Sequence, residues 1–207
     1  SSSSAASDVY KRQVGTQMLS KGHHFPNVTL VAAVDGDIGL NLPDYRAAEK
    51  TFQLLVQLAG RAGRGDRPGH VLIQTRNPDH PCWVHIRNGD YQGFFTQELE
   101  RRRRFGYPPF VKLGMVRFSH LVDWEQGGAM LAKAGEILRS AAEKPGVRVL
   151  GPAPAPLSRI KGRKRFHCLL KAGHWQDIRE VYGCLLRNLP GSSAFRMSLD
   201  LDPVNML

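Results

Sequence analysis

The sequence predicts an α/β protein in two parts, a parallel β-α-β unit followed by a small α+β domain. Residues 28–34 form an uninterrupted apolar, β-rich run, which is typical of a strand buried on both faces of a parallel sheet. Residues 45–59 show helical periodicity and separate this run from a second short strand at residues 70–75. After residue 110, strands and helices follow in the order βαββαβ, which indicates helices packed on an open sheet, as in ferredoxin-like or ribosomal-protein-like domains.

The elements of the first part have clear boundaries. Asp35-Gly36-Asp37 ends the first strand, and a loop through Gly39 and Pro43 leads into the helix. The apolar side chains of the helix fall on one stripe: Tyr45, Ala48, Phe52, Leu55 and Ala59. A turn at residues 65–69 precedes the second strand, and Asn77-Pro78 ends it. Asp35 and Asp37 are paired carboxylates that suit either Mg²⁺ or a structural turn, and we favour the turn.

A helical linker, residues 81–106, is expected between the two parts. An imperfect apolar stripe runs along residues 81–104, and Gly106 with Pro108-Pro109 ends the helix. Arg101 to Arg104 give the helix a strongly basic end. Two interpretations are open for these arginines, compensation of the helix dipole in solvent and contact with DNA.

The second part is expected to cover residues 107–207. Strands are predicted at residues 111–119, 147–150, 165–170 and 195–201, with helices at residues 124–142 and 175–186. Residues 151–156, rich in Gly, Pro and Ala, are expected to form a stiff extended connection.

The composition favours a polyanionic partner. The net charge is +11, from 29 Lys and Arg against 18 Asp and Glu, and nucleic acid is a more usual partner for such a chain than an anionic membrane surface. No stretch approaches the roughly 20 apolar residues that a transmembrane helix needs. Three cysteines without C-x-x-C spacing indicate a reducing compartment and no zinc site in this chain. Residues 1–13 are rich in Ser and Ala and lack the apolar core of a signal peptide, so we expect a leader foreign to the fold.

The string Gln57-Leu58-Ala59-Gly60-Arg61-Ala62-Gly63-Arg64 is the most specific motif in the chain. Helical spacing places Gln57, Gly60, Arg61 and Arg64 opposite the apolar stripe. The two glycines leave space beside arginines whose planar, permanent charge suits a transferring γ-phosphoryl group. We therefore expect Arg61, Arg64 and Gln57 to act in catalysis. For a lone Arg-x-x-Arg, a solvated helix end would be the more usual interpretation.

This string resembles the last conserved motif of superfamily 2 helicases, and other motifs narrow the resemblance. In order they are G-T-Q-M-x-x-K-G-H-x-F from Gly15, P-x-V-T-L-V, D-x-D, P-D-Y-R-A-x-E and Q-x-x-G-R-A-G-R. Further matches are Tyr107-Pro108-Pro109-Phe110, the 151–156 stretch, Ser158-Arg159-Ile160-Lys161 and the closing L-D-L-D-P. Together they look like the PriA (primosomal protein N′) family of replication-restart helicases, matched from about Val14 to Leu207.

The resemblance implies that the chain is a C-terminal fragment. Residues 14–80 would end the second RecA-like helicase lobe, and residues 107–207 would form a C-terminal DNA-binding domain. The chain contains no G-x-x-x-x-G-K-[ST] loop, so the ATP and Mg²⁺ of the family would be held by a lobe upstream, as would its zinc by upstream cysteines. The fragment alone should not hydrolyse ATP, and the protein is expected in the bacterial cytoplasm.

The resemblance also assigns roles to residues near the start of the match. Thr16, Lys21 and Gly22 would contact DNA phosphates through a hydroxyl, a charge and a backbone N–H. His24 and Gly60 would face the nucleotide, although the family often has an acidic residue at the position of His24. Because no Cys or acidic ligand lies near His23-His24, we expect no metal there.

The densest basic segment lies between residues 158 and 167. We expect a hairpin tip that binds the DNA backbone without sequence preference through Arg159, Lys161, Arg163, Lys164 and Arg165. Phe166 either stacks on a base or lies in the core. In the family this domain engages branched DNA.

The resemblance further implies protein partners. PriA proteins are recruited by the acidic C-terminal tail of single-stranded-DNA-binding protein, through basic and polar residues of the penultimate helix, and we expect Arg179 to contribute. Other primosome proteins are also expected to bind. The function indicated is an ATP-dependent 3′→5′ DNA helicase that recognises stalled or branched forks and initiates primosome assembly. The alternative is a non-catalytic basic nucleic-acid-binding module, which would have no use for arginines placed at a phosphoryl group.

Overall fold

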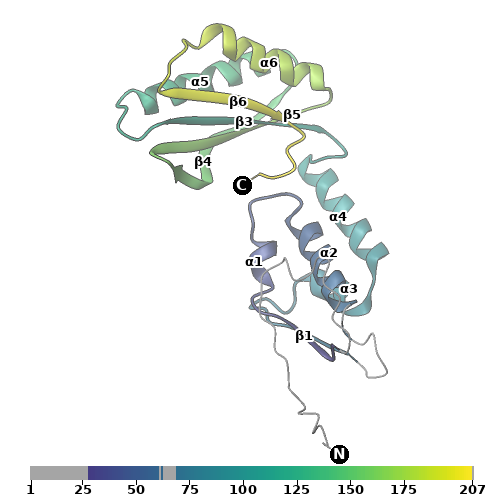
Figure 1. The fold of residues 1–207 in the computed structure, drawn as a ribbon. Coiled ribbons are helices and arrows are strands. Elements are labelled where there is room, and N and C mark those ends of the chain that lie inside the picture. The colour runs from purple at the N-terminus through teal and green to yellow at the C-terminus, as the bar shows by residue number, and fades with distance from the viewer. Residues whose placement is uncertain (1–27, 61, 63–68, 207) are drawn as a thin grey trace, which may run out of the picture.

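The structure, a computed structural model, describes residues 28–60, 62 and 69–206 of the chain. It has two sheets, a parallel pair β1 (Leu30–Ala33) and β2 (His70–Ile73), and a four-stranded antiparallel sheet in the order β4-β5-β3-β6. The prediction of a mixed α/β protein with a parallel unit first is confirmed. Figure 1 shows the helices α1–α4 beneath one end of the larger sheet.

The parallel unit contains α1 (Asp37–Leu40) and α2 (Ala47–Ala59) between its two strands. Tyr45, Phe52 and Leu55 of the predicted stripe are buried, and the ring of Phe52 stacks on Phe94 at a centroid distance of 4.2 Å. The prediction that the first strand is buried on both faces is wrong for this chain. Leu30 is 55% exposed and Leu72 of β2 is 59% exposed, and these residues share one face of the two-stranded sheet, which the described residues leave uncovered.

The predicted single helix over residues 81–104 is in fact two helices, α3 (Pro81–Asn88) and α4 (Tyr91–Phe105). Gly89 adopts the left-handed conformation, with φ of 63°, and ends α3. The carboxylate of Asp90 accepts a hydrogen bond from the backbone N–H of Gly93 at 2.8 Å, which caps the start of α4. Gly106 ends α4 as predicted, again with a positive φ.

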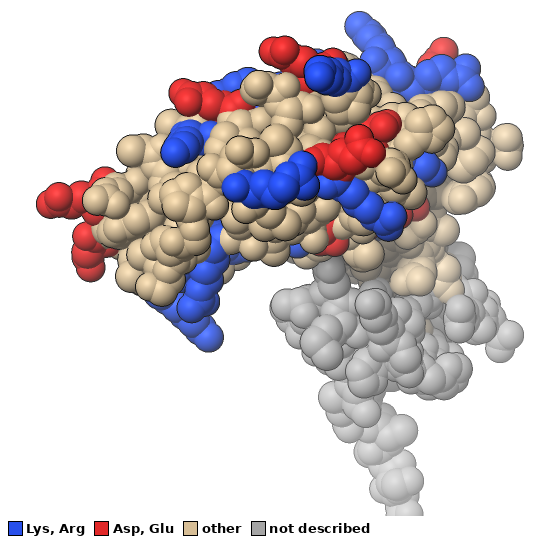
Figure 2. All heavy atoms as spheres, turned by 90° about the horizontal axis from the view of Figure 1, so that it is seen from above, with Lys and Arg blue, Asp and Glu red and all other residues tan. Residues whose placement is uncertain are grey.

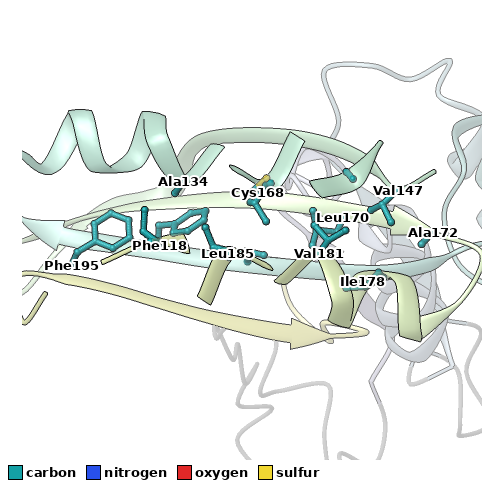
Figure 3. Close-up of a cluster of buried hydrophobic side chains, with 14 residues drawn as sticks. Phe118, Ala134, Val147, Cys168, Leu170, Ala172, Ile178, Val181, Leu185 and Phe195 are labelled. Atoms are coloured by element: carbon teal, nitrogen blue, oxygen red, sulfur yellow. The ribbon is translucent and has the colours of Figure 1, made fainter. Parts of the chain in front are cut away.

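The second part has the predicted order βαββαβ. Its elements are β3 (Lys112–Leu121), α5 (Gly127–Ala142), β4 (Arg148–Ile160), β5 (Arg163–Ala172), α6 (Trp175–Asn188) and β6 (Phe195–Leu201). Both helices cover the same face of the sheet (Figure 1). The core between helices and sheet is apolar and fully buried (Figure 3), with Phe118, Leu138, Leu170, Ile178 and Leu185 at its centre.

Strand β4 is longer than predicted. Residues 151–156, expected to be a connection, belong to a strand that continues to Ile160. The ladder with β5 shifts register between Leu150 and Ala153 and again between Pro154 and Arg159. Since β4 is an edge strand, its prolines can be accommodated at these irregularities, where no hydrogen bond to a further strand is required.

Candidate nucleic-acid interface

Several predicted site residues lie outside the described part of the chain. These are Thr16, Lys21, Gly22, His24, Arg61 and Arg64. Of the predicted site residues in the arginine string, Gln57 and Gly60 are described. Both are exposed at the C-terminal end of α2, where Gly60 is the cap residue and its N–H points back to the carbonyl of Val56 at 3.0 Å.

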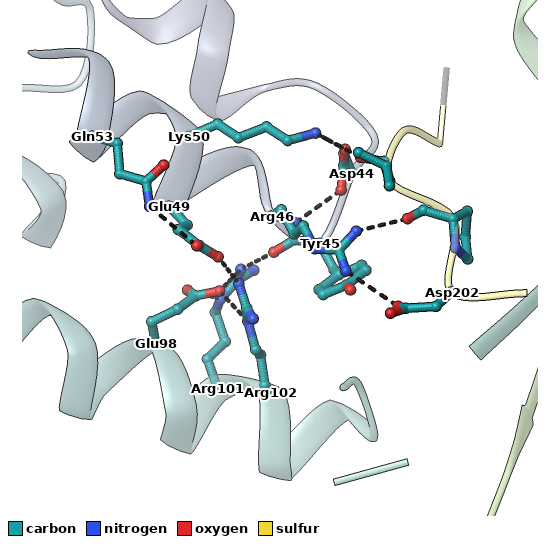
Figure 4. A network of polar contacts seen from close by, with 12 residues as sticks. Asp44, Tyr45, Arg46, Glu49, Lys50, Gln53, Glu98, Arg101, Arg102 and Asp202 are labelled. Atoms are coloured by element: carbon teal, nitrogen blue, oxygen red, sulfur yellow. Dashed lines mark hydrogen bonds and ion pairs between the residues drawn. The ribbon is translucent and has the colours of Figure 1, made fainter. Parts of the chain in front are cut away.

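The N-terminal end of α2 is hydrogen-bonded to the C-terminal segment of the chain (Figure 4). Arg46 donates hydrogen bonds to the carbonyl oxygen of Pro203 at 2.7 Å and to the carboxylate of Asp202 at 3.2 Å. Lys50 pairs with the buried Asp44 at 2.7 Å and reaches the carbonyl oxygen of Val204 at 3.2 Å. The helix that leads into the arginine string is therefore joined to the antiparallel domain by its N-cap residue and its first turn.

Helix α4 contributes a buried carboxylate to the same junction. Glu98, 7% exposed, accepts hydrogen bonds from Arg101 at 2.9 Å and from Arg102 at 2.8 Å. Arg102 also pairs with Glu49 of α2 at 2.6 Å, and Arg101 donates to the carbonyl oxygen of Tyr45 at 2.8 Å. For these two arginines the structure adds a structural role, because Arg102 joins α4 to α2 and Arg101 joins α4 to the residue Tyr45 before α2.

A cavity of about 330 Å³ lies beside this junction. Its lining combines an apolar floor with cations from α2, α4 and β3: Tyr45, Arg46, Arg102, Pro108, Pro109, Val111, Lys112, Trp175 and Asp202. The ammonium group of Lys112 lies 5.6 Å from the centroid of the Trp175 ring. Arg179, the residue predicted to bind a partner, is exposed one turn after Trp175 on α6 and is outside the lining.

The predicted basic hairpin is the turn between β4 and β5. Lys161 and Gly162 form its tip with φ of 47° and 72°, the two positive values that a two-residue type I′ turn requires. Arg159 and Lys161 are exposed. Because side chains alternate along a strand, Arg163 and Arg165 lie on one face of β5 and Lys164 lies on the other. The five predicted cations therefore do not share one face.

Two of these cations make contacts within the sheet. Arg163 donates to the hydroxyl and the carbonyl oxygen of Ser119, at 3.1 and 3.0 Å, and to the carbonyl oxygen of Ala194 at 2.7 Å. Burial and, secondarily, Arg196 lower the pKa of Arg163, which nevertheless stays charged near neutral pH. Arg165 donates to the carbonyl oxygen of Leu157 at 3.4 Å. Phe166 packs against the domain core, so the core interpretation of this residue is supported.

Neighbouring strands add basic and polar residues to the face that carries Arg165. In the strand register, Ser119 of β3 is paired with Arg165 and also with Arg196 of β6. In the next row, Arg117 is paired with His167 and with Ser198. Sequence reasoning missed Arg117 and Arg196, because an isolated arginine in a strand gives no signal until the register is known.

The charge of this face comes from arginine rather than histidine. His167 lies between Arg117 and Arg165, and its Nε2 atom is buried without a hydrogen-bond partner. Burial, and then the charges of Arg117 and Arg165, lower the pKa of His167 from its usual value of 6.5. The ring is therefore neutral at physiological pH.

The acidic pair after β1 has a structural role. Asp37 accepts hydrogen bonds from the hydroxyl of Thr75 at 2.7 Å and from the backbone N–H of Arg76 at 2.6 Å. The backbone hydrogen bond, followed by that from Thr75, lowers the pKa of Asp37. Asp35 pairs with the side chain of Arg76 at 3.2 Å. Both oxygens of Asp37 thus accept hydrogen bonds that join the ends of the two parallel strands. This supports the interpretation of the acidic pair as a structural turn rather than as a Mg²⁺ site.

The cysteines are separate from one another. Cys82 and Cys168 are buried, and burial raises the pKa of their thiols to about 11 and about 12. Within the described residues, no three His, Cys, Asp or Glu side chains are grouped as metal ligands. Among the described helices, none has the length and apolar character that a membrane span requires.

Comparison with known proteins agrees with this arrangement. The family described as "Primosomal protein N C-terminal domain" matches residues 103–204. Replication restart protein PriA of Bacillus subtilis (strain 168) is 43% identical over 197 residues, which cover 94% of this chain and 24% of that protein. The PriA proteins of Treponema pallidum (strain Nichols) and Haemophilus influenzae (strain Rd) are 39% and 38% identical, over 94% and 93% of this chain and 29% and 26% of their own lengths. The chain spans about a quarter of the length of these relatives and belongs to the PriA family.

Proposed function

We propose that this chain is the C-terminal part of an ATP-dependent 3′→5′ DNA helicase that recognises stalled or branched replication forks and initiates primosome assembly. The observation that carries the proposal is similarity over 94% of the chain to a protein named for replication restart. The basic hairpin on the C-terminal domain and the arginine string after α2 support it, because they supply the two contacts that such a helicase needs, with DNA and with ATP.

The catalytic contribution is assigned to the end of α2. β1, α2 and β2 form a parallel β-α-β unit, which fits the edge of a RecA-like lobe. Arg61 and Arg64, with Gln57 one turn earlier, would stabilise charge on the γ-phosphoryl group, and Gly60 and His24 would lie on the nucleotide side. ATP and Mg²⁺ would be held by a lobe upstream of this sequence, and zinc by upstream cysteines. This chain alone would then be inactive as an ATPase.

DNA contact is assigned to the hairpin and, near the start of the chain, to Thr16, Lys21 and Gly22. The hairpin tip is a two-stranded ribbon carrying Arg159, Lys161 and Lys164, and a ribbon of this kind fits a duplex groove. Its cations would contact phosphates, so binding should fall steeply with salt.

A salt titration with branched DNA tests this assignment. The 207-residue chain should bind a labelled fork without ATP. Replacing Arg159, Lys161 and Lys164 with Gln should make the slope of log K against log salt shallower by up to about 2.7, at about 0.9 per phosphate contact on duplex DNA. The matched control replaces three exposed cations on the helical side of the domain, Lys133, Lys144 and Arg187. An unchanged slope in the hairpin variant would place fork binding elsewhere.

The alternative, a non-catalytic nucleic-acid-binding module, explains the charge of the chain but not the arginine string. The two proposals differ in a measurable way. A module would show no ATP-linked activity in the longer protein, whereas the helicase would hydrolyse ATP and lose that activity when Arg64 is replaced.

The cavity at the junction favours a second partner, the acidic C-terminal tail of single-stranded-DNA-binding protein. A lining that combines Arg46, Arg102 and Lys112 with the ring of Trp175 suits an acidic peptide, and Arg179 lies one turn along the same helix. Lys112→Ala and Arg179→Ala should each weaken binding of a labelled peptide that copies this acidic tail, measured by fluorescence anisotropy. Lys133→Ala should leave binding unchanged, and wild-type affinity in both test variants would rule the cavity out.

A further inference from the structure

The face of the antiparallel sheet turned away from α5 and α6 is divided into two halves. At the end near α4, a small apolar cluster covers it, with Leu113 and Met115 of β3 against Tyr45, Tyr107 and Met206. At the other end, toward the β4–β5 turn, the same face carries Arg165, Ser119 and Arg196 in one row across three strands. Arg117 and Ser198 lie in the next row. We call these five residues the arginine face.

The charge on these strands is almost entirely of one sign. The sole acidic residue in β3, β4, β5 and β6 is Asp200, and Arg117 neutralises it at 2.6 Å. The cations on the face turned away from the helices are Arg117, Arg148, Arg163, Arg165, Arg196 and the buried Lys171, whereas Lys112, Arg159 and Lys164 lie on the other face. The helical side differs, because Figure 2 shows acidic and basic side chains interspersed over it. A polyanion is therefore attracted to the sheet side rather than the helix side.

The chemistry of the arginine face suits phosphates rather than bases. Its five side chains offer guanidinium and hydroxyl groups, both of which donate hydrogen bonds to phosphate oxygens. The aromatic residues of the same strands, Phe118, Phe166 and Phe195, belong to the core on the other face. The ring of His167 also lies on this face, but it is only partly exposed and its Nε2 atom is buried, so we expect phosphate contacts to dominate and binding to depend little on sequence.

The shape of the face selects the form of DNA. Neighbouring strands lie about 4.8 Å apart, so Arg165 and Arg196, separated by β3, have backbones about 10 Å apart across the sheet. A duplex groove accepts a helix or a projecting β-ribbon, and the hairpin tip is such a ribbon. The five residues of the arginine face lie on the strands themselves and not on a projecting element, so a single strand can lie across them.

We propose that the arginine face binds the phosphates of single-stranded DNA, which crosses β5, β3 and β6 next to the hairpin tip. This rests on the proposed function, in which the hairpin engages the duplex arm of a fork, and adds a separate site for the adjoining single strand. Arg163 supports the site, since its bonds to Ser119 and Ala194 hold the β3, β5 and β6 ends together.

The test measures binding of labelled oligothymidylate to the 207-residue chain by anisotropy over a range of salt concentrations. The double variant Arg165→Gln/Arg196→Gln should bind more weakly and show a slope shallower by up to about 1.4, at about 0.7 per contact on a single strand. The control Lys133→Gln/Arg187→Gln removes the same charge from the helical side and should match wild type. Affinity for a blunt duplex should change little in either variant.

A second variant separates loss of binding from loss of folding. Ser198 is exposed on β6, and Ser198→Glu adds a negative charge to the face without removing a strand contact of Arg163 or Arg165. It should weaken oligothymidylate binding while the urea midpoint stays at the wild-type value.

The outcomes distinguish this site from the hairpin. If the hairpin variant weakens fork binding and the arginine-face variants bind oligothymidylate like wild type, the arginine face is not a site and the proposed function stands. If duplex affinity falls as much as single-strand affinity, the assignment to single strands is wrong. If the chain binds neither the fork nor oligothymidylate, the assignments of the hairpin and of the arginine face to DNA binding are both wrong.

Discussion

Replacing Glu98 with alanine should destabilise the folded chain, because it removes the buried carboxylate at the junction of α2 and α4. Glu98 is 7% exposed and accepts three hydrogen bonds from two arginines, at 2.8 to 2.9 Å. The side chain of Arg102 is 12% exposed, whereas that of Arg101 is 46% exposed. The two arginines therefore respond differently when their partner is lost.

The magnitude follows from that difference. Breaking a fully buried ion pair costs about 3–5 kcal/mol, since a charge stays buried without its partner. Here Arg101 can be hydrated, and Arg102 keeps its contact with Glu49 at 2.6 Å. We therefore expect a loss of about 2–3 kcal/mol in the free energy of unfolding, below the fully buried limit. With a urea m-value of about 2 kcal/mol per M, the midpoint should fall by more than about 1 M.

The loss in the free energy of unfolding is measured by urea denaturation, with far-UV circular dichroism as the signal. The matched control is Glu100→Ala, an exposed glutamate on the same helix, which should change stability by less than about 0.5 kcal/mol. The variant Glu98→Gln keeps the shape but removes the charge and should fall between the two. If Glu98→Ala is no more destabilising than Glu100→Ala, the Glu98 carboxylate does not stabilise the arginines that join α4 to α2.

Three further predictions concern titration, thiols and zinc. The pKa values of His80 and His167 are lowered, mainly by burial, so the unfolded chain takes up protons at about pH 6.5 that the folded chain does not. The free energy of unfolding should therefore fall as the pH drops below about 6.5, and it should fall less in His167→Gln. A urea midpoint that rises on acidification would contradict this prediction. Cys184 is partly exposed, whereas Cys82 and Cys168 are buried and have raised thiol pKa values. Cys184 alone should therefore react quickly with Ellman's reagent under native conditions. Rapid reaction of all three thiols would be inconsistent with the fold. The purified chain should contain no stoichiometric zinc by elemental analysis, and about one tightly held zinc per chain would show that our interpretation of the cysteines is wrong.

Hydrophobic periodicity was sufficient to predict the order of the helices and strands along the chain, but not which of them lie next to one another in the fold. The helix containing Phe52 and Leu55 and the strand at 195–201 were predictable, because their patterns are strong. The break at Gly89 could have been found from Asn88-Gly89-Asp90, which combines a helix-ending glycine with a capping aspartate. The strand at residues 151–156 could not have been predicted from the sequence. Proline is tolerated there because β4 is an edge strand, and only the sheet order reveals that position.

The candidate sites divide in the same way. The cations of the hairpin were predictable as a dense basic run, but their distribution over two faces follows from strand alternation and turn position. Arg117 and Arg196 needed the register, and Arg101 and Arg102 find their partners outside α4 at Tyr45 and Glu49, far away in the sequence. Sequence patterns report local spacing, whereas these arrangements depend on pairing between distant segments.

The most direct test of the central proposal, that this chain completes an ATP-dependent helicase, is the rate of ATP hydrolysis by the longer protein carrying Arg64→Ala. Turnover should fall by roughly 10³-fold or more, as when an arginine finger is lost, while binding of forked DNA stays near wild type. Arg67→Ala, three residues later and outside the arginine string, should hydrolyse ATP at close to the wild-type rate. Near-normal turnover in Arg64→Ala would contradict the account and favour a non-catalytic nucleic-acid-binding module.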